Sequence, residues 1–228
     1  MTIFIGNVVA RLRVIVGGTG LLLAMLAGAA LASGDWPMLA HDPARSGSTA
    51  TEIRPPFSRK WYRLFPDEGL MSGVQPIVSG GKVFVGTMKG VLHAMDAQMG
   101  RDVWMYTAPQ AILHTCAAGR SVVVFGCADG RVYALDADSG MLAWSVQTGA
   151  AIWNAPLIWD NSALIGSRDG RLYAIDIESG TVRWKATTGG PLLSSPALDA
   201  KRNRAYIASE DMHVYAFDLS DGTQRWRS

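Results

Sequence analysis

The chain has 228 residues, 49% of them hydrophobic and 18% charged, with 21 basic and 19 acidic residues. Two of the basic residues and none of the acidic ones lie in the first 32 residues, so the remainder carries 19 of each sign. This balance, with the basic residues scattered, gives no electrostatic basis for nucleic-acid binding and indicates a solvated surface.

Residues 1–32 have the pattern of an export signal. Two arginines precede an apolar run that ends in the small residues Ala30 and Ala32, and this order is typical of a cleaved signal peptide. The alternative is an uncleaved anchor, because the apolar stretch from Val14 has 19 residues, which just reaches the length that spans a bilayer. We therefore expect a periplasmic or extracellular protein that contacts a membrane only through an uncleaved N-terminal segment.

Residues 33–72 form a lead-in segment, with one strand-like stretch at 59–64. Four repeats follow, at about 73–110, 111–150, 151–190 and 191–228, and each ends in the pattern Ala-x-Asp-x3-Gly-x3-Trp. Such self-similarity predicts one supersecondary unit per repeat, stable only when it stacks on its neighbours. The residues of the pattern are Ala94, Asp96, Gly100, Trp104, Ala134, Asp136, Gly140, Trp144, Ala174, Asp176, Gly180, Trp184, Ala216, Asp218, Gly222 and Trp226.

Turn signals divide each repeat into four short strands. In the second repeat the strands are predicted at 113–117, 121–127, 131–136 and 141–148, separated by Gly-Arg, Asp-Gly and Ser-Gly turns. Short strands bounded in this way form an antiparallel meander. Four-stranded sheets that recur about every 40 residues are the blades of a β-propeller. The sequence therefore predicts an all-β propeller, of which the four repeats are part of a seven- or eight-bladed ring.

The repeated pattern resembles the tryptophan-docking motif of the pyrroloquinoline-quinone (PQQ-like) propeller family. Residues 35–47 look like the segment that precedes the first blade in exported, BamB-like members, so the resemblance covers residues 35–228. In this arrangement we expect Trp to bury a large apolar area and to donate its N–H to a neighbouring backbone group, with Ala and Gly leaving room for the indole. The Asp would accept hydrogen bonds from the following turn. These residues are interpreted as structural rather than as a site.

The resemblance makes residues 59–64 the outer strand of a blade that closes the ring. The sequence stops two residues after the fourth Trp, so we expect either a fragment of a ring or two half-rings that complete one another. Open blade faces would then allow self-association.

Candidate binding residues lie on the loops that share one face of such a propeller, around the central channel. They come from the loops between blades and from the turns inside each blade, and the alternative is that these loops are merely solvated. The candidates are His114, Trp153, Asn154, Arg168, Asp169 and Ser194, with the further turn residues Lys89, Asp129, Glu210 and Asp211.

The resemblance implies an exported, non-catalytic scaffold, similar in kind to BamB, with a protein or a cell-envelope polymer as partner and no cofactor. One alternative is a PQQ-dependent dehydrogenase or a fragment of one. Those members sandwich PQQ between a Trp and two adjacent cysteines and hold calcium nearby, and this chain has no adjacent cysteine pair. Another alternative, if residues 1–32 are an anchor, is a sensor or substrate-binding ectodomain.

The two cysteines and the four histidines remain as candidates for a disulfide and for a metal site. Cys116 and Cys127 are placed by the repeat on adjacent strands, one diagonal step apart, which leaves a disulfide and two separately buried thiols both open. The four histidines stand at unrelated spacings, so no metal cluster is predicted.

Overall fold

The computed structural model describes residues 35–49 and 59–228, and the expected export segment at residues 1–32 lies outside them. The described residues form sixteen β-strands and no helix. Accordingly, none of these residues belongs to a helix long and apolar enough to cross a membrane.

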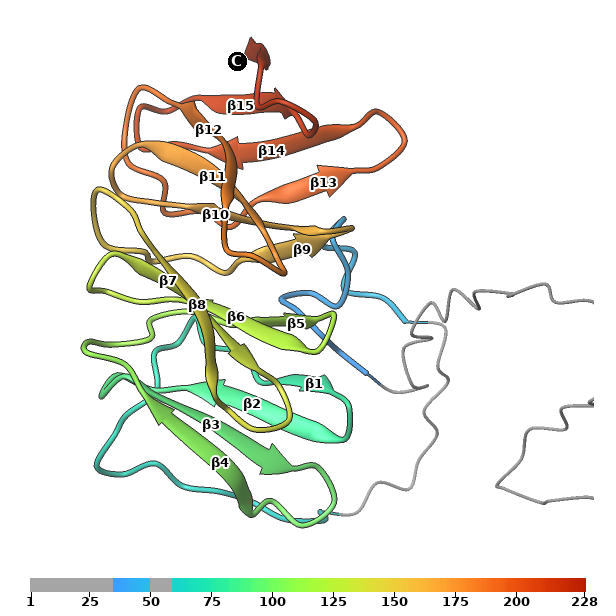
Figure 1. Ribbon diagram of the computed structural model, residues 1–228, viewed down its shortest axis with the longest axis vertical. Coiled ribbons are helices and arrows are strands. Elements are labelled where there is room, and N and C mark those ends of the chain that lie inside the picture. Colours follow the sequence, from blue (N-terminus) through green and yellow to red (C-terminus); the bar gives the residue numbers. More distant parts are fainter. Residues whose placement is uncertain (1–34, 50–58) are drawn as a thin grey trace, which may run out of the picture. The chain divides into compact units, whose positions relative to one another are not determined.

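The strands form four four-stranded antiparallel sheets, each in sequence order (Figure 1). The first sheet contains β1 (Ile77–Ser79), β2 (Lys82–Gly86), β3 (Val91–Asp96) and β4 (Asp102–Thr107). The second contains β5 (Ala117–Gly119), β6 (Val122–Gly126), β7 (Arg131–Asp136) and β8 (Leu142–Gln147). The third contains β9 (Leu157–Trp159), β10 (Ser162–Gly166), β11 (Arg171–Asp176) and β12 (Val182–Thr187). The fourth contains β13 (Ala197–Asp199), β14 (Arg204–Ala208), β15 (Val214–Asp218) and β16 (Gln224–Arg227).

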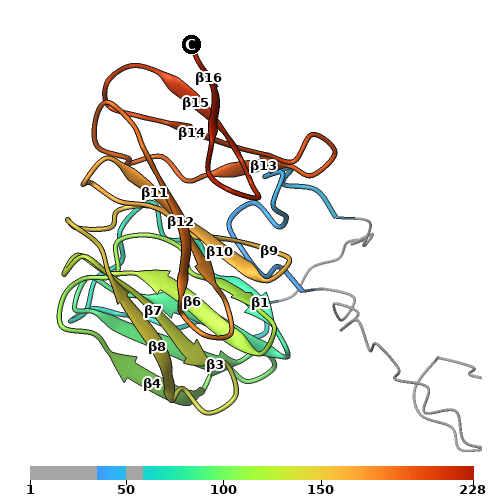
Figure 2. The same ribbon diagram turned by 45° about the horizontal axis from the view of Figure 1, so that its top comes forward.

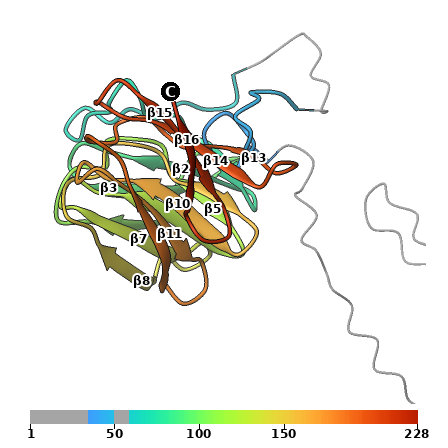
Figure 3. The ribbon, with the colours of Figure 1, turned by 90° about the horizontal axis from the view of Figure 1, so that it is seen from above.

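The four sheets are propeller blades that stack face to face in chain order. Figures 1 and 2 show the stack running from β1–β4 at one end to β13–β16 at the other, and Figure 3 shows it from above, with the fourth sheet foremost. The arc is open, because the fourth sheet does not return to the first. This confirms the predicted all-β blades.

Both faces of the inner blades are buried, which explains why their strands are nearly continuous apolar runs. In β6, Val123 and Phe125 belong to the core between the first and second sheets, whereas Val124 belongs to the core between the second and third. A corresponding core joins the third and fourth sheets around Leu164 and Ile207.

Each outer strand places a tryptophan against the next sheet. Trp104 donates its indole N–H to the carbonyl of Ala137 at 3.1 Å. Its ring lies so close to Gly140 that a Cβ there would be 2.6 Å away, and Gly140 also has a positive φ of 72°, so glycine is required on both counts. The same N–H donation joins Trp144 to Ile177 and Trp184 to Leu219.

The predicted outer strand at residues 59–64 pairs with no strand among the residues that the structure describes, because no further strand of its blade is among them. Trp61 nevertheless behaves as the other outer-strand tryptophans do. Its N–H donates to the carbonyl of Ala97 at 3.0 Å, and its ring lies against Gly100.

Residues 35–49, here called the strap, run along the first strands of all four blades (blue in Figure 1). Backbone bonds reach the first, second and fourth blades, and the Arg45 side chain reaches the third. The contacts join Trp36 to Val78, Pro37 to Ala118, Pro43 to Leu198 and Arg45 to Pro156.

Arg45 is the centre of the strap. Its guanidinium donates to the carbonyls of Leu39 at 2.6 Å, Pro156 at 3.1 Å and Pro196 at 3.1 Å. Burial lowers the pKa of Arg45 to about 10, an effect opposed by the carboxylate of Asp42. The side chain therefore ties the strap to the third and fourth blades.

Candidate functional site

The most exposed part of the candidate site is built by a turn of the third blade and by the loop that connects the second blade to the third. The turn after β10 holds Arg168, and the loop between β8 and β9 holds Trp153; the backbone N–H of Arg168 donates to the carbonyl of Ala151 at 3.1 Å. The guanidinium carbon of Arg168 lies 4.1 Å from the centroid of the Trp153 ring, within the range of a cation–π contact. Trp153 remains 39% exposed.

Arg168 keeps unused hydrogen-bonding capacity. Its Nε is buried and has no hydrogen-bond partner among the described residues. Next to it is a shallow cavity of about 130 Å³, bounded by Arg168, Asp169, Thr188 and Pro191 with the intervening glycines. Trp153 and Arg168 thus present a partly exposed indole and the guanidinium stacked on it on one surface.

Asp169 lies beside this surface, but its carboxylate is already satisfied. It accepts hydrogen bonds from the Tyr173 hydroxyl at 2.6 Å, the Gly149 N–H at 2.8 Å and the Arg171 N–H at 2.9 Å. Burial and this bond raise the pKa of Tyr173. The same Asp–Tyr bond joins Asp129 to Tyr133 and Asp211 to Tyr215 in the neighbouring blades, which indicates a structural role.

Asn154 and Ser194 are also engaged inside the protein. Asn154 is 1% exposed; its amide donates to the carbonyls of Gly166 and Leu192 and accepts the N–H of Gly166. Ser194 donates to the carbonyl of Ala208 at 2.8 Å and accepts its N–H at 3.0 Å. Both side chains therefore use their polar atoms on backbone groups of the protein.

His114 lies next to Gly73, where an added Cβ would be 3.4 Å from the imidazole Nε2. Its Nδ1 accepts the N–H of Thr115 at 2.9 Å. Burial, and then the positive charge of Arg45, lower the pKa of His114. The six sequence candidates therefore do not form one site: Trp153, Arg168 and Asp169 are neighbours, and the other three serve local bonds.

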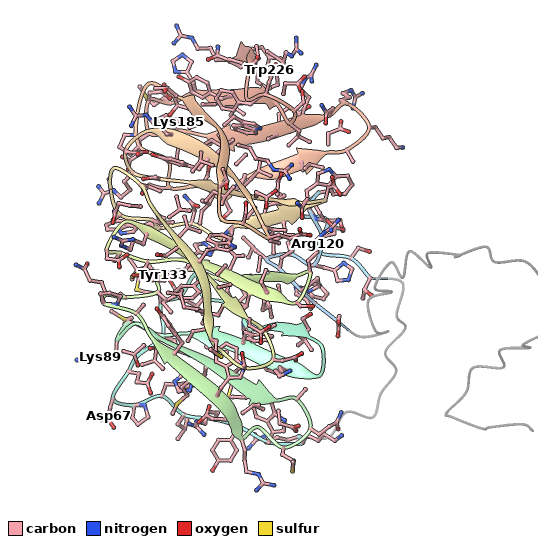
Figure 4. The ribbon with its side chains drawn as sticks, in the orientation of Figure 1. Asp67, Lys89, Arg120, Tyr133, Lys185 and Trp226 are labelled. Carbon is pink, nitrogen blue, oxygen red and sulfur yellow. The ribbon has the colours of Figure 1, made fainter. Side chains whose placement is uncertain are left out.

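The two ends of the strands are distinct surfaces. Figure 4 shows Lys89, in the first-blade turn equivalent to that of Arg168, at one side of the stack and Arg120, in the turn after β5, at the opposite side. The Trp153–Arg168 pair belongs to the Lys89 side, because β10 runs from Ser162 to Gly166 and Arg168 follows its end.

The first blade contains a network of charged side chains around the buried His93, and this network was not among the sequence predictions. His93 is 1% exposed; its Nδ1 lies 3.0 Å from Asp102 and its Nε2 2.9 Å from Glu68. Arg63 donates to the other oxygen of Asp102 at 2.6 Å. The other blades have a Tyr at the position of His93 and an Asp at the turn position of Lys89. The simultaneous loss of this Tyr–Asp pair is the sequence signal that could have predicted the network.

The residues around Trp153 do not fit a flat quinone cofactor with an oxygen-coordinated ion. The guanidinium of Arg168 covers the ring, and the Asn154 amide and Asp169 carboxylate are bound to other protein groups. In the described part of the chain, no group of three or more His, Cys, Asp or Glu side chains is arranged so that it could hold a metal ion.

Cys116 and Cys127 are free thiols and both are buried. Burial raises the pKa of Cys116 to about 12 and that of Cys127 to about 11. Thiols with such pKa values stay protonated near neutral pH and are poor nucleophiles.

A family model described as outer membrane protein assembly factor BamB matches residues 40–158 and 148–228. No curated protein matches the chain. Among solved structures, BamB from Moraxella catarrhalis is 25% identical with a TM-score of 0.63, and the match covers 74% of this chain and 51% of that one.

Alcohol and methanol dehydrogenases share the fold at lower identity. Quinohemoprotein alcohol dehydrogenase ADHIIG from Pseudomonas putida HK5 is 22% identical with a TM-score of 0.72, over 86% of this chain and 40% of that one. A europium-containing methanol dehydrogenase is 18% identical with a TM-score of 0.68, over 86% and 49%. This chain therefore spans about half or less of the length of these structures.

Proposed function

This chain belongs to the family of the outer membrane protein assembly factor BamB, and on that premise we propose that it is an exported, non-catalytic propeller scaffold. It binds a protein or a cell-envelope polymer through the surface formed by Trp153 and Arg168. No cofactor takes part in this role. The observation that supports it is that Trp153 is exposed with the guanidinium of Arg168 stacked on its ring, while the polar neighbours are bound internally.

Trp and Arg suit this role because they dominate the energetics of protein interfaces. The pair is also held in place before binding, since Arg168 is anchored by its backbone bond to Ala151 and stacks on Trp153. Preorganised side chains lose less conformational entropy on association.

The alternative, a PQQ-dependent dehydrogenase or a fragment of one, has support from the fold alone, because the matching enzymes are 18–22% identical. The engaged Asn154 and Asp169 side chains favour the scaffold. The two proposals differ in what Trp153 contacts: a partner surface in one, a stacked quinone in the other.

A photo-crosslinking amino acid placed at position 153 tests the scaffold in the native host. Met141 is the matched control, because it is 71% exposed and lies in the turn before β8, at the opposite strand ends. We expect a discrete crosslinked product from position 153, none from position 141, and loss of the first when Arg168→Ala is added. Equal products from both positions, or none from position 153, would contradict the proposal.

A further inference from the structure

A groove lies between the third and fourth blades, at the strand ends opposite to Trp153 and Arg168. It encloses about 200 Å³. Leu164 and Leu219 lie at its apolar base, Trp159 and Arg183 line it from the third blade, and Asn203 lines it from the fourth. Drug-sized ligands occupy about 300–1,000 Å³, so this volume suits a smaller molecule, of the size of a single sugar ring.

The groove is open because of one residue in the repeat. Lys82, Val122 and Ser162 start the second strand of their blades, each paired with the Asp of the repeated pattern. Lys82 crosses to the next blade and donates to Asp138 at 2.7 Å, and Val122 packs on the core between the second and third blades. Ser162 is too short to do either, so the space beside it stays unfilled.

An aromatic ring forms one side of the groove. Trp159 ends the first strand of its blade and is 39% exposed. The equivalent positions in the first and second blades hold the small residues Ser79 and Gly119. An exposed indole beside leucine side chains offers a flat apolar surface of the kind that C–H groups pack on.

Polar groups with spare hydrogen-bonding capacity surround that surface. Arg183 uses Nε and Nη2 on Asp176, at 3.2 and 2.6 Å, which leaves its other terminal nitrogen. Asn203 donates Nδ2 to Asp218 at 3.0 Å, and its Oδ1 accepts no bond from the described residues. The Ser162 hydroxyl and the exposed Asp160 carboxylate add acceptors at the rim.

The charges near the groove are paired within the protein, which favours a neutral ligand. Arg183 is bound to Asp176, and Asp160 lies 3.4 Å from Arg120. A ligand that combines apolar C–H faces with several hydroxyl groups satisfies both the indole and the scattered donors and acceptors.

We propose that this groove binds a neutral hexose unit, with a C–H face of the ring on Trp159 and hydroxyls on Asp160, Arg183 and Asn203. The unit is a free monosaccharide or the terminal residue of a glycan, because both present the same ring. The groove lies away from the Trp153–Arg168 surface, so the proposal stands independently of the scaffold function.

The test is an NMR titration of the full chain with D-glucose, D-galactose, D-mannose and N-acetyl-D-glucosamine. We expect a saturable shift of the Trp159 indole resonance and saturation transfer to the ring protons of at least one sugar. Trp159→Ala and Ser162→Lys, which copies Lys82 into the groove, should each weaken binding by about tenfold or more. Trp153→Ala, at the opposite strand ends, should leave it unchanged.

Two controls keep the result interpretable. Circular dichroism melting shows whether Ser162→Lys is folded, and Ser162→Val, which copies Val122, provides a second filled groove. Tighter binding of a matching oligosaccharide than of its monosaccharide identifies a glycan terminus, whereas equal affinities identify a free sugar. The proposal is overturned if none of the four sugars binds saturably, or if binding survives in both folded groove-filling variants.

Discussion

At the scale of single residues, the contribution of each repeat's final tryptophan to stability depends on whether it contacts a following blade. Trp144 is 8% exposed and donates its N–H to Ile177 of the next blade, whereas Trp226 is 45% exposed. We predict that Trp144→Ala lowers the free energy of unfolding by about 3–5 kcal/mol. Trp226→Ala should cost about 1 kcal/mol or less. Urea denaturation measures both, and equal losses would show that contact with the next blade is not what stabilises the indole.

The aspartates of the repeat make stability depend on acid. The Arg183 side chain, followed by the Ser179 N–H, holds the pKa of Asp176 well below its usual value of about 4. Because the folded-state pKa is lowered, the contribution of Asp176 is present above pH 4 and is lost as the pH falls further.

The Asp176→Asn variant tests this linkage. We expect the difference in free energy of unfolding between wild type and Asp176→Asn to be largest near neutral pH and to shrink below about pH 4. Arg183→Gln, which removes the main cause of the low pKa, should behave similarly. Urea titrations at a series of pH values provide the measurement, and a difference that is independent of pH would refute the linkage.

At the scale of elements, the strap contacts all four blades, at or next to the first strand of each. Arg45→Ala would leave three partly buried carbonyls without their donor, at Leu39, Pro156 and Pro196. We predict a loss of about 2–4 kcal/mol in the free energy of unfolding. The matched control is Arg202→Ala, whose side chain is 76% exposed in its ion pair and should matter by about 0.5 kcal/mol. Similar melting of the two variants would mean that the strap does not clamp the blades.

The blades and the loop residues Trp153 and Arg168 could be predicted from sequence, whereas the contacts of the strap and the bonds that occupy the other candidate residues could not. The spacing of Ala, Asp, Gly and Trp determines the period, because each residue meets a local backbone requirement that recurs in every blade. Arg45 bonds to carbonyls 111 and 151 residues away, and no periodic signal indicates such contacts. His93 departs from the repeat, which marks the first blade as different but does not indicate that Glu68 is its partner. Hydrogen bonds distinguish the candidate loop residues from one another. Asn154 and Ser194 are predicted binding residues, but their polar atoms bond to the backbone of neighbouring strands.

At the scale of the whole molecule, the arc of blades has apolar surface at both ends. Trp226 is half-exposed on the fourth blade, and an apolar cavity of about 250 Å³ lies on the outer side of the first blade near Phe65, Leu70 and Met95. Exposed patches of this kind promote association. We predict that this chain self-associates with increasing concentration and that Trp226→Glu weakens the association. Sedimentation velocity measures it, and a monomer at every concentration would disprove the prediction.

The central claim is that this propeller is a scaffold rather than a quinone enzyme, and a titration of the full chain with PQQ and calcium tests it most directly. Equilibrium dialysis reports binding, and tryptophan fluorescence reports contact with an indole. We expect no saturable binding, because Arg168 already covers Trp153 and the nearby oxygens are engaged. Stoichiometric, calcium-dependent PQQ binding that is abolished by Trp153→Ala would contradict the account and identify a quinoprotein.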